Sequence, residues 1–193
     1  MNIHLLPPSS SPPLLLLPAP RPLTGKWHIW ALLLALAGGV FGVLGAFFTE
    51  LSHTSLLSAF VAAPIIEEGL KPSGLYLLLA KWPRVLRSQI YTASLAALGG
   101  IVFALIENQV YLNIYIRDPS PEVILFRYTA CIGVHAACSF IFGLGINRKL
   151  LDSIRGETRF LSCGKRFFFS AMALHSLFNI TVTVLQLWLG WLD

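Results

Sequence analysis

The chain alternates between long apolar segments and short polar stretches. Five apolar segments run over residues 27–48, 54–80, 89–116, 123–147 and 167–192. About 20 helical residues cross the roughly 30 Å hydrocarbon core of a bilayer, so each segment is long enough to span it. The pattern therefore predicts an all-α membrane protein, built as a bundle of about five transmembrane helices.

Polar side chains interrupt four of these segments well inside their ends. The interruptions are Glu67, Glu68 and Lys71 in the second segment, Glu107 and Asn108 in the third, His135 in the fourth, and His175 and Asn179 in the fifth. A charged group in the middle of a bilayer costs about 2.5–3.5 kcal/mol on insertion scales, so it is expected to face a partner or water. We therefore predict that these side chains share one polar site in the bilayer interior.

The spacing of the charges in the second segment indicates how they meet. Residues three or four apart lie on one face of a helix, which places Lys71 beside both Glu67 and Glu68. Pro72 follows directly and removes a backbone hydrogen bond, so we expect a kink at this point. In lipid, a kink of this kind is tolerated where the freed carbonyl groups face a cavity or a neighbouring helix.

Composition excludes a soluble domain. Hydrophobic residues make up 55% of the 193 residues, charged residues only 12%, and the mean hydropathy is +0.71; soluble domains contain about 25% charged residues. Residues 1–26 carry seven prolines and lack the uninterrupted apolar run of a signal peptide. We expect a Pro-rich disordered tail over residues 1–26 and a single transmembrane helical domain over 27–193.

The basic residues predict an orientation in the membrane. Eleven of the fourteen Lys and Arg residues lie in the tail and in the 81–88 and 147–166 loops, which five alternating spans place on one side. The positive-inside rule assigns that side to the cytoplasm, with the C-terminus outside. The net charge of +5 therefore points to a lipid bilayer, including attraction to anionic lipid, and not to nucleic acid. A prokaryotic plasma membrane is the default location.

The buried histidines and carboxylates suit two kinds of hydrolysis. Zinc accepts histidine nitrogen and carboxylate oxygen, so zinc is the candidate cofactor. A carboxylate in an apolar cavity can instead activate water as a general base without a metal. Asn108 and Asn179 are candidate donors to the oxyanion of a tetrahedral intermediate. The sequence does not decide between the metal-dependent and the glutamic-type scheme.

Two motifs resemble those of a known family. The stretch Pro64-Ile-Ile-Glu67-Glu68-Gly-Leu-Lys71 resembles the EExxK motif of the PrsW family of intramembrane proteases, and Phe103-Ala-Leu-Ile-Glu107-Asn108 resembles its FxxxE motif. Single histidines follow in later helices, as in that family, and the resemblance covers residues 27–192. It implies an intramembrane endopeptidase, a hydrolase that cuts membrane-anchored proteins such as an anti-sigma factor at its first cleavage site.

The resemblance also implies roles for individual residues. Carried over by position, either Glu67 or Glu68 would activate water. The implied catalytic residues are Glu67, Glu68, Glu107, His135 and His175. The predicted supporting residues are Lys71, Asn108 and Phe103 from the two motifs, together with Asn179, which lies one helical turn after His175. A metal would be held by Glu107, His135 and His175.

Two other functions fit parts of the pattern. A small transporter, or a proton or metal pathway, also uses buried Glu and His side chains. That function is typically accompanied by an inverted repeat with paired broken helices, and only one Pro-broken polar segment is evident here. A non-catalytic scaffold descended from a protease would lack a site residue, and none of the expected ones is missing. We therefore favour the protease.

Overall fold

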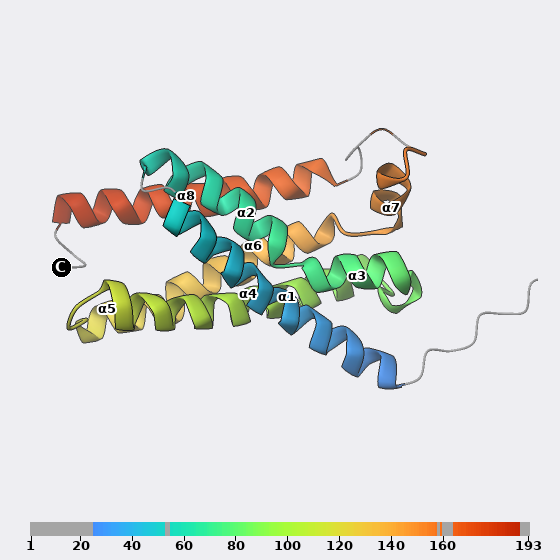
Figure 1. Cartoon of the computed structure of the whole chain (residues 1–193), viewed down its shortest axis with the longest axis horizontal. Coiled ribbons are helices and arrows are strands. Elements are labelled where there is room, and N and C mark those ends of the chain that lie inside the picture. The colour runs from blue at the N-terminus through green and yellow to red at the C-terminus, as the bar shows by residue number, and fades with distance from the viewer. Residues whose placement is uncertain (1–24, 53–54, 158, 160–163, 190–193) are drawn as a thin grey trace, which may run out of the picture.

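The computed structural model describes residues 25–52, 55–157, 159 and 164–189, and this part of the chain contains helices and no strand (Figure 1). The predicted all-α membrane fold is therefore confirmed. Most of the expected Pro-rich tail, residues 1–24, lies outside the described residues. The helices lie side by side as an elongated bundle, with α7 and the start of α1 toward one end and α5 toward the other.

Four helical stretches are long and apolar enough to cross a membrane. They are Gly25–Phe48, Gln89–Tyr115, Pro121–Leu144 and Lys165–Trp188. The first belongs to α1 (Gly25–Ser52) and the last to α8 (Lys165–Leu189). The second joins α4 (Gln89–Val110) to the π-helical turn η3 (Tyr111–Tyr115), and the third joins α5 (Pro121–Phe126), the π-helical turn η4 (Arg127–Cys131) and α6 (Ile132–Leu144).

The remaining predicted span, residues 54–80, is divided into three pieces. It consists of a π-helical turn η1 (Ser58–Ala62), α2 (Ala63–Leu70) and α3 (Ser73–Lys81). The break falls at Pro72, whose backbone angles of φ −88° and ψ 19° leave the helical region. The kink expected at this proline is confirmed, and its effect is to end α2 at Leu70, two residues after Glu68.

Small residues on α1 bring that helix close to the end of α2. A Cβ atom on Gly38 would lie 2.5 Å from the carbonyl oxygen of Lys71, and one on Gly42 would lie 3.0 Å from its Cγ. Only glycine allows the two backbones to approach to this distance, as is common where helices meet in lipid. The stem of Lys71 is thereby held between α1 and the centre of the bundle.

Two short elements and an apolar core complete the opposite half of the bundle. The 3-10 turn η2 (Pro83–Val85) joins α3 to α4, and α7 (Arg148–Ile154) follows α6. Between them lies a buried apolar cluster that includes Leu78, Phe142 and Phe168. The polar side chains of α2, α4, α6 and α8 therefore converge in the other half, beyond this apolar core.

Candidate functional site

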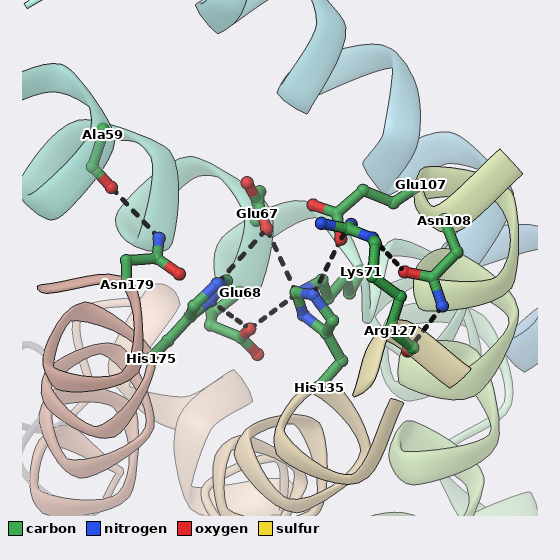
Figure 2. A network of polar contacts seen from close by, with 10 residues as sticks. All are labelled: Ala59, Glu67, Glu68, Lys71, Glu107, Asn108, Arg127, His135, His175 and Asn179. Carbon is green, nitrogen blue, oxygen red and sulfur yellow. Dashed lines mark hydrogen bonds and ion pairs between the residues drawn. The ribbon is translucent and has the colours of Figure 1, made fainter. Parts of the chain in front are cut away.

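The five residues implied as catalytic lie together, although they come from four different helices (Figure 2). Glu67 and Glu68 project from α2, Glu107 from α4, His135 from α6 and His175 from α8. All five are shielded from solvent: the most open, Glu107, has a side chain 17% exposed. The structure thus brings together the set that the sequence marked as a single site.

Glu68 is the most deeply buried of the three carboxylates. Its side chain is 0% exposed and accepts a hydrogen bond of 2.6 Å from Nζ of Lys71. His175 Nδ1 lies 2.9 Å from the same oxygen, and Ser139 donates to the other oxygen at 3.4 Å. Helices α6 and α8 are therefore both tied to α2 through this single carboxylate.

Glu67 faces a cavity that Glu68 does not reach. The cavity has a volume of about 470 Å³, and its lining includes Glu67, Glu107, His135 and His175. Lys71 Nζ approaches Glu67 Oε2 at 3.4 Å, and His175 Nε2 lies 3.8 Å from the same oxygen. The pairing of Lys71 with both glutamates, predicted from their spacing, is confirmed, and the contact to Glu67 is the longer of the two.

Glu107 is held by two nitrogen donors from the helix formed by α5, η4 and α6. Its Oε2 lies 3.1 Å from His135 Nε2 and 3.3 Å from an Nη of Arg127. The other ring nitrogen of His135, Nδ1, lies 2.9 Å from Lys71 Nζ. His135 therefore links the Lys71–Glu68 pair to Glu107.

Arg127 is a residue of this site that the sequence analysis missed. Its Nε donates to Asn108 Oδ1 at 3.0 Å, while Asn108 Nδ2 donates back to the Arg127 carbonyl at 2.7 Å. The guanidinium carbon also lies 4.0 Å from the ring centroid of Tyr111, a cation–π contact. The signal was present, because an arginine inside an apolar segment is as costly as a glutamate.

The supporting residues predicted from the sequence take different positions around the site. Phe103 is fully buried, with Lys71 Nζ 4.0 Å from its ring centroid and the His135 ring 5.0 Å away. Asn179 lines the cavity, and its amide donates to the carbonyl of Ala59 at 3.1 Å. Phe103 therefore packs beneath the ion pair, and Asn179 fastens α8 to η1.

All three π-helical turns of the described chain contribute to the lining of this cavity. Ser58 comes from η1, Tyr111 and Tyr115 from η3, and Arg127 and Cys131 from η4. A π-helical turn holds one residue more than an α-helical turn, and such turns are frequent at functional sites. The cavity extends from the buried carboxylates toward the end of the bundle where α4 ends and α5 begins.

Three donors at this site fit a metal ion. One ligand atom each from Glu67, His135 and His175 lies within 4.8 Å of the others, and all three residues are buried. Two imidazole nitrogens and one carboxylate oxygen form a donor set that zinc accepts. The sequence implied Glu107 in place of Glu67, whereas in the structure Glu107 is engaged by Arg127 and His135.

The two histidines of this set differ in their readiness to bind. The carboxylate of Glu68 faces His175 Nδ1, which leaves Nε2 directed at Glu67; a carboxylate behind a histidine is the usual way to orient a ligand. His135 has both ring nitrogens facing protein groups, so holding a metal requires it to exchange one of those partners.

The charges of the site do not cancel. Three carboxylates, from Glu67, Glu68 and Glu107, face two cations, Lys71 and Arg127. Every buried side-chain nitrogen and oxygen among the described residues nevertheless has a hydrogen-bond partner. The site is thus well satisfied in hydrogen bonds and negative in charge, as expected of a place that accepts a cation.

Comparison with known proteins gives one match. The sequence model of a family described as PrsW family intramembrane metalloprotease matches residues 20–192, nearly the whole chain. No curated protein and no solved structure matches it.

Proposed function

This chain belongs to the PrsW family of intramembrane metalloproteases, and we propose that it is an endopeptidase that hydrolyses membrane-anchored proteins at the site around Glu67. The observation that carries the proposal is the convergence of two carboxylates and two histidines on one cavity inside an apolar bundle. Aromatic side chains of the cavity, among them Tyr111, Phe126 and Phe178, suit an apolar substrate segment. Site-1-type cleavage, as of an anti-sigma factor, is the activity we assign.

The three carboxylates take separate roles in this proposal. Glu67, His135 and His175 would hold zinc, which when bound would act as a Lewis acid toward the scissile carbonyl. Glu107 is the other carboxylate that lines the cavity, and we assign it as the general base that takes a proton from water. Arg127 keeps this carboxylate in place through its contact with Oε2.

Glu68 does not line the cavity, and we assign it a positioning role. It holds His175 by Nδ1 and neutralises Lys71, so it acts on the reaction through these two neighbours. Of the two glutamates between which the sequence could not decide, Glu67 is therefore a ligand and Glu68 a support. Activation of water is therefore assigned to Glu107, the carboxylate of the third predicted segment.

The test compares cleavage and zinc content in the same preparations. Purified protein in liposomes is given a panel of single-span membrane proteins, with and without a chelator and added zinc. We expect Glu107→Gln to keep zinc and lose cleavage by about 10²–10⁴-fold, the usual contribution of a general base. Glu67→Gln should lose both. The exposed Glu122 provides a matched control, and Glu122→Gln should retain both.

Two outcomes would change the assignment. If Glu67→Gln keeps zinc and Glu107→Gln loses it, the ligand and the base are exchanged. If no variant affects cleavage but ion flux across the liposomes depends on Glu107 or His175, the protein is a transporter and not a protease.

We further propose that the N-terminus is cytoplasmic, the C-terminus is outside and the membrane is a prokaryotic plasma membrane. One end of the bundle carries Arg84 and Arg87 of the 81–88 loop, Arg148 and Lys149 of α7 and Arg166 of α8, and the cavity extends toward the other end. The scissile bond would then lie in the half of the bilayer away from the cytoplasm. Labelling of single cysteines introduced at Arg117 and Arg155, in intact cells, tests this: only the first should react with an impermeant reagent.

A further inference from the structure

A second cavity lies at the end of the bundle opposite the active-site cavity. Its volume is about 940 Å³, and it lies where α3 leads into α4 and α6 leads into α7. Five cationic side chains line it: Arg84, Arg87, Arg148, Lys149 and Arg166. The lining provided by the described residues contains no Asp or Glu. The cavity is therefore strongly positive.

The cations come from three separate connections of the chain. Arg84 and Arg87 lie between α3 and α4, Arg148 and Lys149 lie at the start of α7, and Arg166 lies at the start of α8. Segments far apart in the sequence thus direct charge into one hollow. Guanidinium groups present several N–H donors in a fixed plane, the arrangement that suits phosphate oxygens.

One part of the cavity wall is apolar. Leu79, Leu86, Ile146 and Phe167 belong to it, alongside the hydroxyl groups of Ser88 and Thr92. A free anion needs no apolar wall, whereas a lipid places a phosphate next to its glycerol backbone and the first carbons of its acyl chains. The mixed lining therefore fits a lipid headgroup better than a free ion.

The depth of the cavity agrees with a headgroup. The apolar spans that border it begin at Gln89 and Lys165 and end at Leu144, so the cavity lies at the surface of the bilayer. Trp82 directly precedes the lining residue Pro83, and its ring pairs with that of Trp27 at a centroid distance of 5.5 Å. Tryptophan is enriched at the level of lipid headgroups.

The orientation rule does not account for the convergence of these charges. Positive residues on the cytoplasmic side need only be present in the loops and need not line a cavity together. Arg155 illustrates the difference, because it is exposed in the same basic loop and contributes nothing to the lining.

We infer that this basic cavity binds the phosphate group of an anionic glycerophospholipid. This site is separate from the protease site and does not depend on the function assigned there. The bound lipid would tie together the α3–α4 connection and the starts of α7 and α8.

The test uses the full purified chain in dodecyl maltoside micelles, where the orientation acquired during biosynthesis has no influence. Native mass spectrometry measures the apparent Kd for dioleoyl phosphatidylglycerol, with dioleoyl phosphatidylcholine as the neutral comparison. The double variant Arg84→Gln/Arg166→Gln should weaken phosphatidylglycerol binding about 25-fold, since one basic residue near an anionic membrane surface contributes about fivefold. Binding of phosphatidylcholine should not change.

The double variant Arg117→Gln/Arg155→Gln is the matched control, because it removes the same charge from exposed positions outside the cavity. It should bind phosphatidylglycerol like the wild type, and both double variants should keep the unfolding midpoint of the wild type in dodecyl maltoside micelles that contain phosphatidylcholine. Equal weakening in the two double variants would overturn the site. Displacement of the lipid by millimolar inorganic phosphate would assign the cavity to a free phosphate instead.

Discussion

Removal of the buried charge pair Lys71–Glu68 is the perturbation with the clearest expected magnitude. Nζ and Oε1 are 2.6 Å apart, and the two side chains are 1% and 0% exposed. Removing one partner of a buried pair costs about 3–5 kcal/mol, because the other charge is left without compensation. The loss of stability in Glu68→Gln should lie at the low end of this range, since Lys71 keeps its 3.4 Å contact with Glu67.

Lys71→Met should be the more damaging of the two substitutions. It leaves the adjacent carboxylates of Glu67 and Glu68 facing each other with no ammonium between them, so we expect a loss near the upper end, about 5 kcal/mol. The double variant Glu68→Gln/Lys71→Met should lose less free energy of unfolding than the sum of the losses in the two single variants. Side chains in direct contact show interaction energies of about 0.5–3 kcal/mol, and this pair should lie near the upper value.

The assay is equilibrium unfolding in mixed micelles titrated with sodium dodecyl sulfate and followed by circular dichroism. Lys81 is an exposed lysine of α3, and Lys81→Met should change the free energy of unfolding by less than about 0.5 kcal/mol. The reasoning is refuted if the two single losses add up in the double variant. In that case the pair would contribute nothing beyond the two separate side chains, and α2 would be held by its packing against α1.

Three other outcomes are expected. Arg127→Gln should lower kcat about 10-fold or more with little change in KM, because Glu107 loses the cation that fixes it; an altered KM alone would contradict this role. Gly39→Ala should cost about 1–3 kcal/mol of stability, because its methyl group would collide with the Gly99 carbonyl, whereas Gly133→Ala meets open space and should be neutral. Zinc at 100 times its Kd should raise the free energy of unfolding by about 2.7 kcal/mol, a gain that His175→Ala should abolish; a gain that persists would place the metal elsewhere.

Much of the site could be predicted because charge is so costly in a bilayer. Glu67, Glu68, Glu107, His135 and His175 stand out in an apolar chain, and the cost of exposing them to lipid requires that they face one another. The pairing of Lys71 with the two glutamates follows from helical spacing alone. These predictions depend on sequence distance or on polarity, both of which can be read directly from the chain.

The partners across helices could not be predicted in the same way. The choice of Glu67 over Glu107 for the metal donor set depends on how α2 and α4 are rotated about their axes, and that rotation is set by packing. Close approaches at glycines and the break at Pro72 fix this rotation. The sequence shows where the glycines and the proline are, but it does not show which helix each of them meets or how far the chain turns there. Arg127 was missed for a different reason, because the basic residues were considered as orientation signals only in the loops.

The π-helical turn η4 makes the number of residues between Arg127 and His135 a functional property. In a continuous α-helix, residues eight apart point about 80° away from each other, since each residue turns the chain by 100°. The extra residue of a π turn makes the pair equivalent to residues seven apart, which differ by only about 20°. Both side chains consequently reach Oε2 of Glu107. Deletion of Ala130 would leave the two residues seven apart, which a continuous α-helix also aligns to within about 20°, whereas insertion of one more residue beside the π turn would turn one of the two about 80° away from the carboxylate. This stretch should therefore tolerate the loss of its extra residue better than the gain of another.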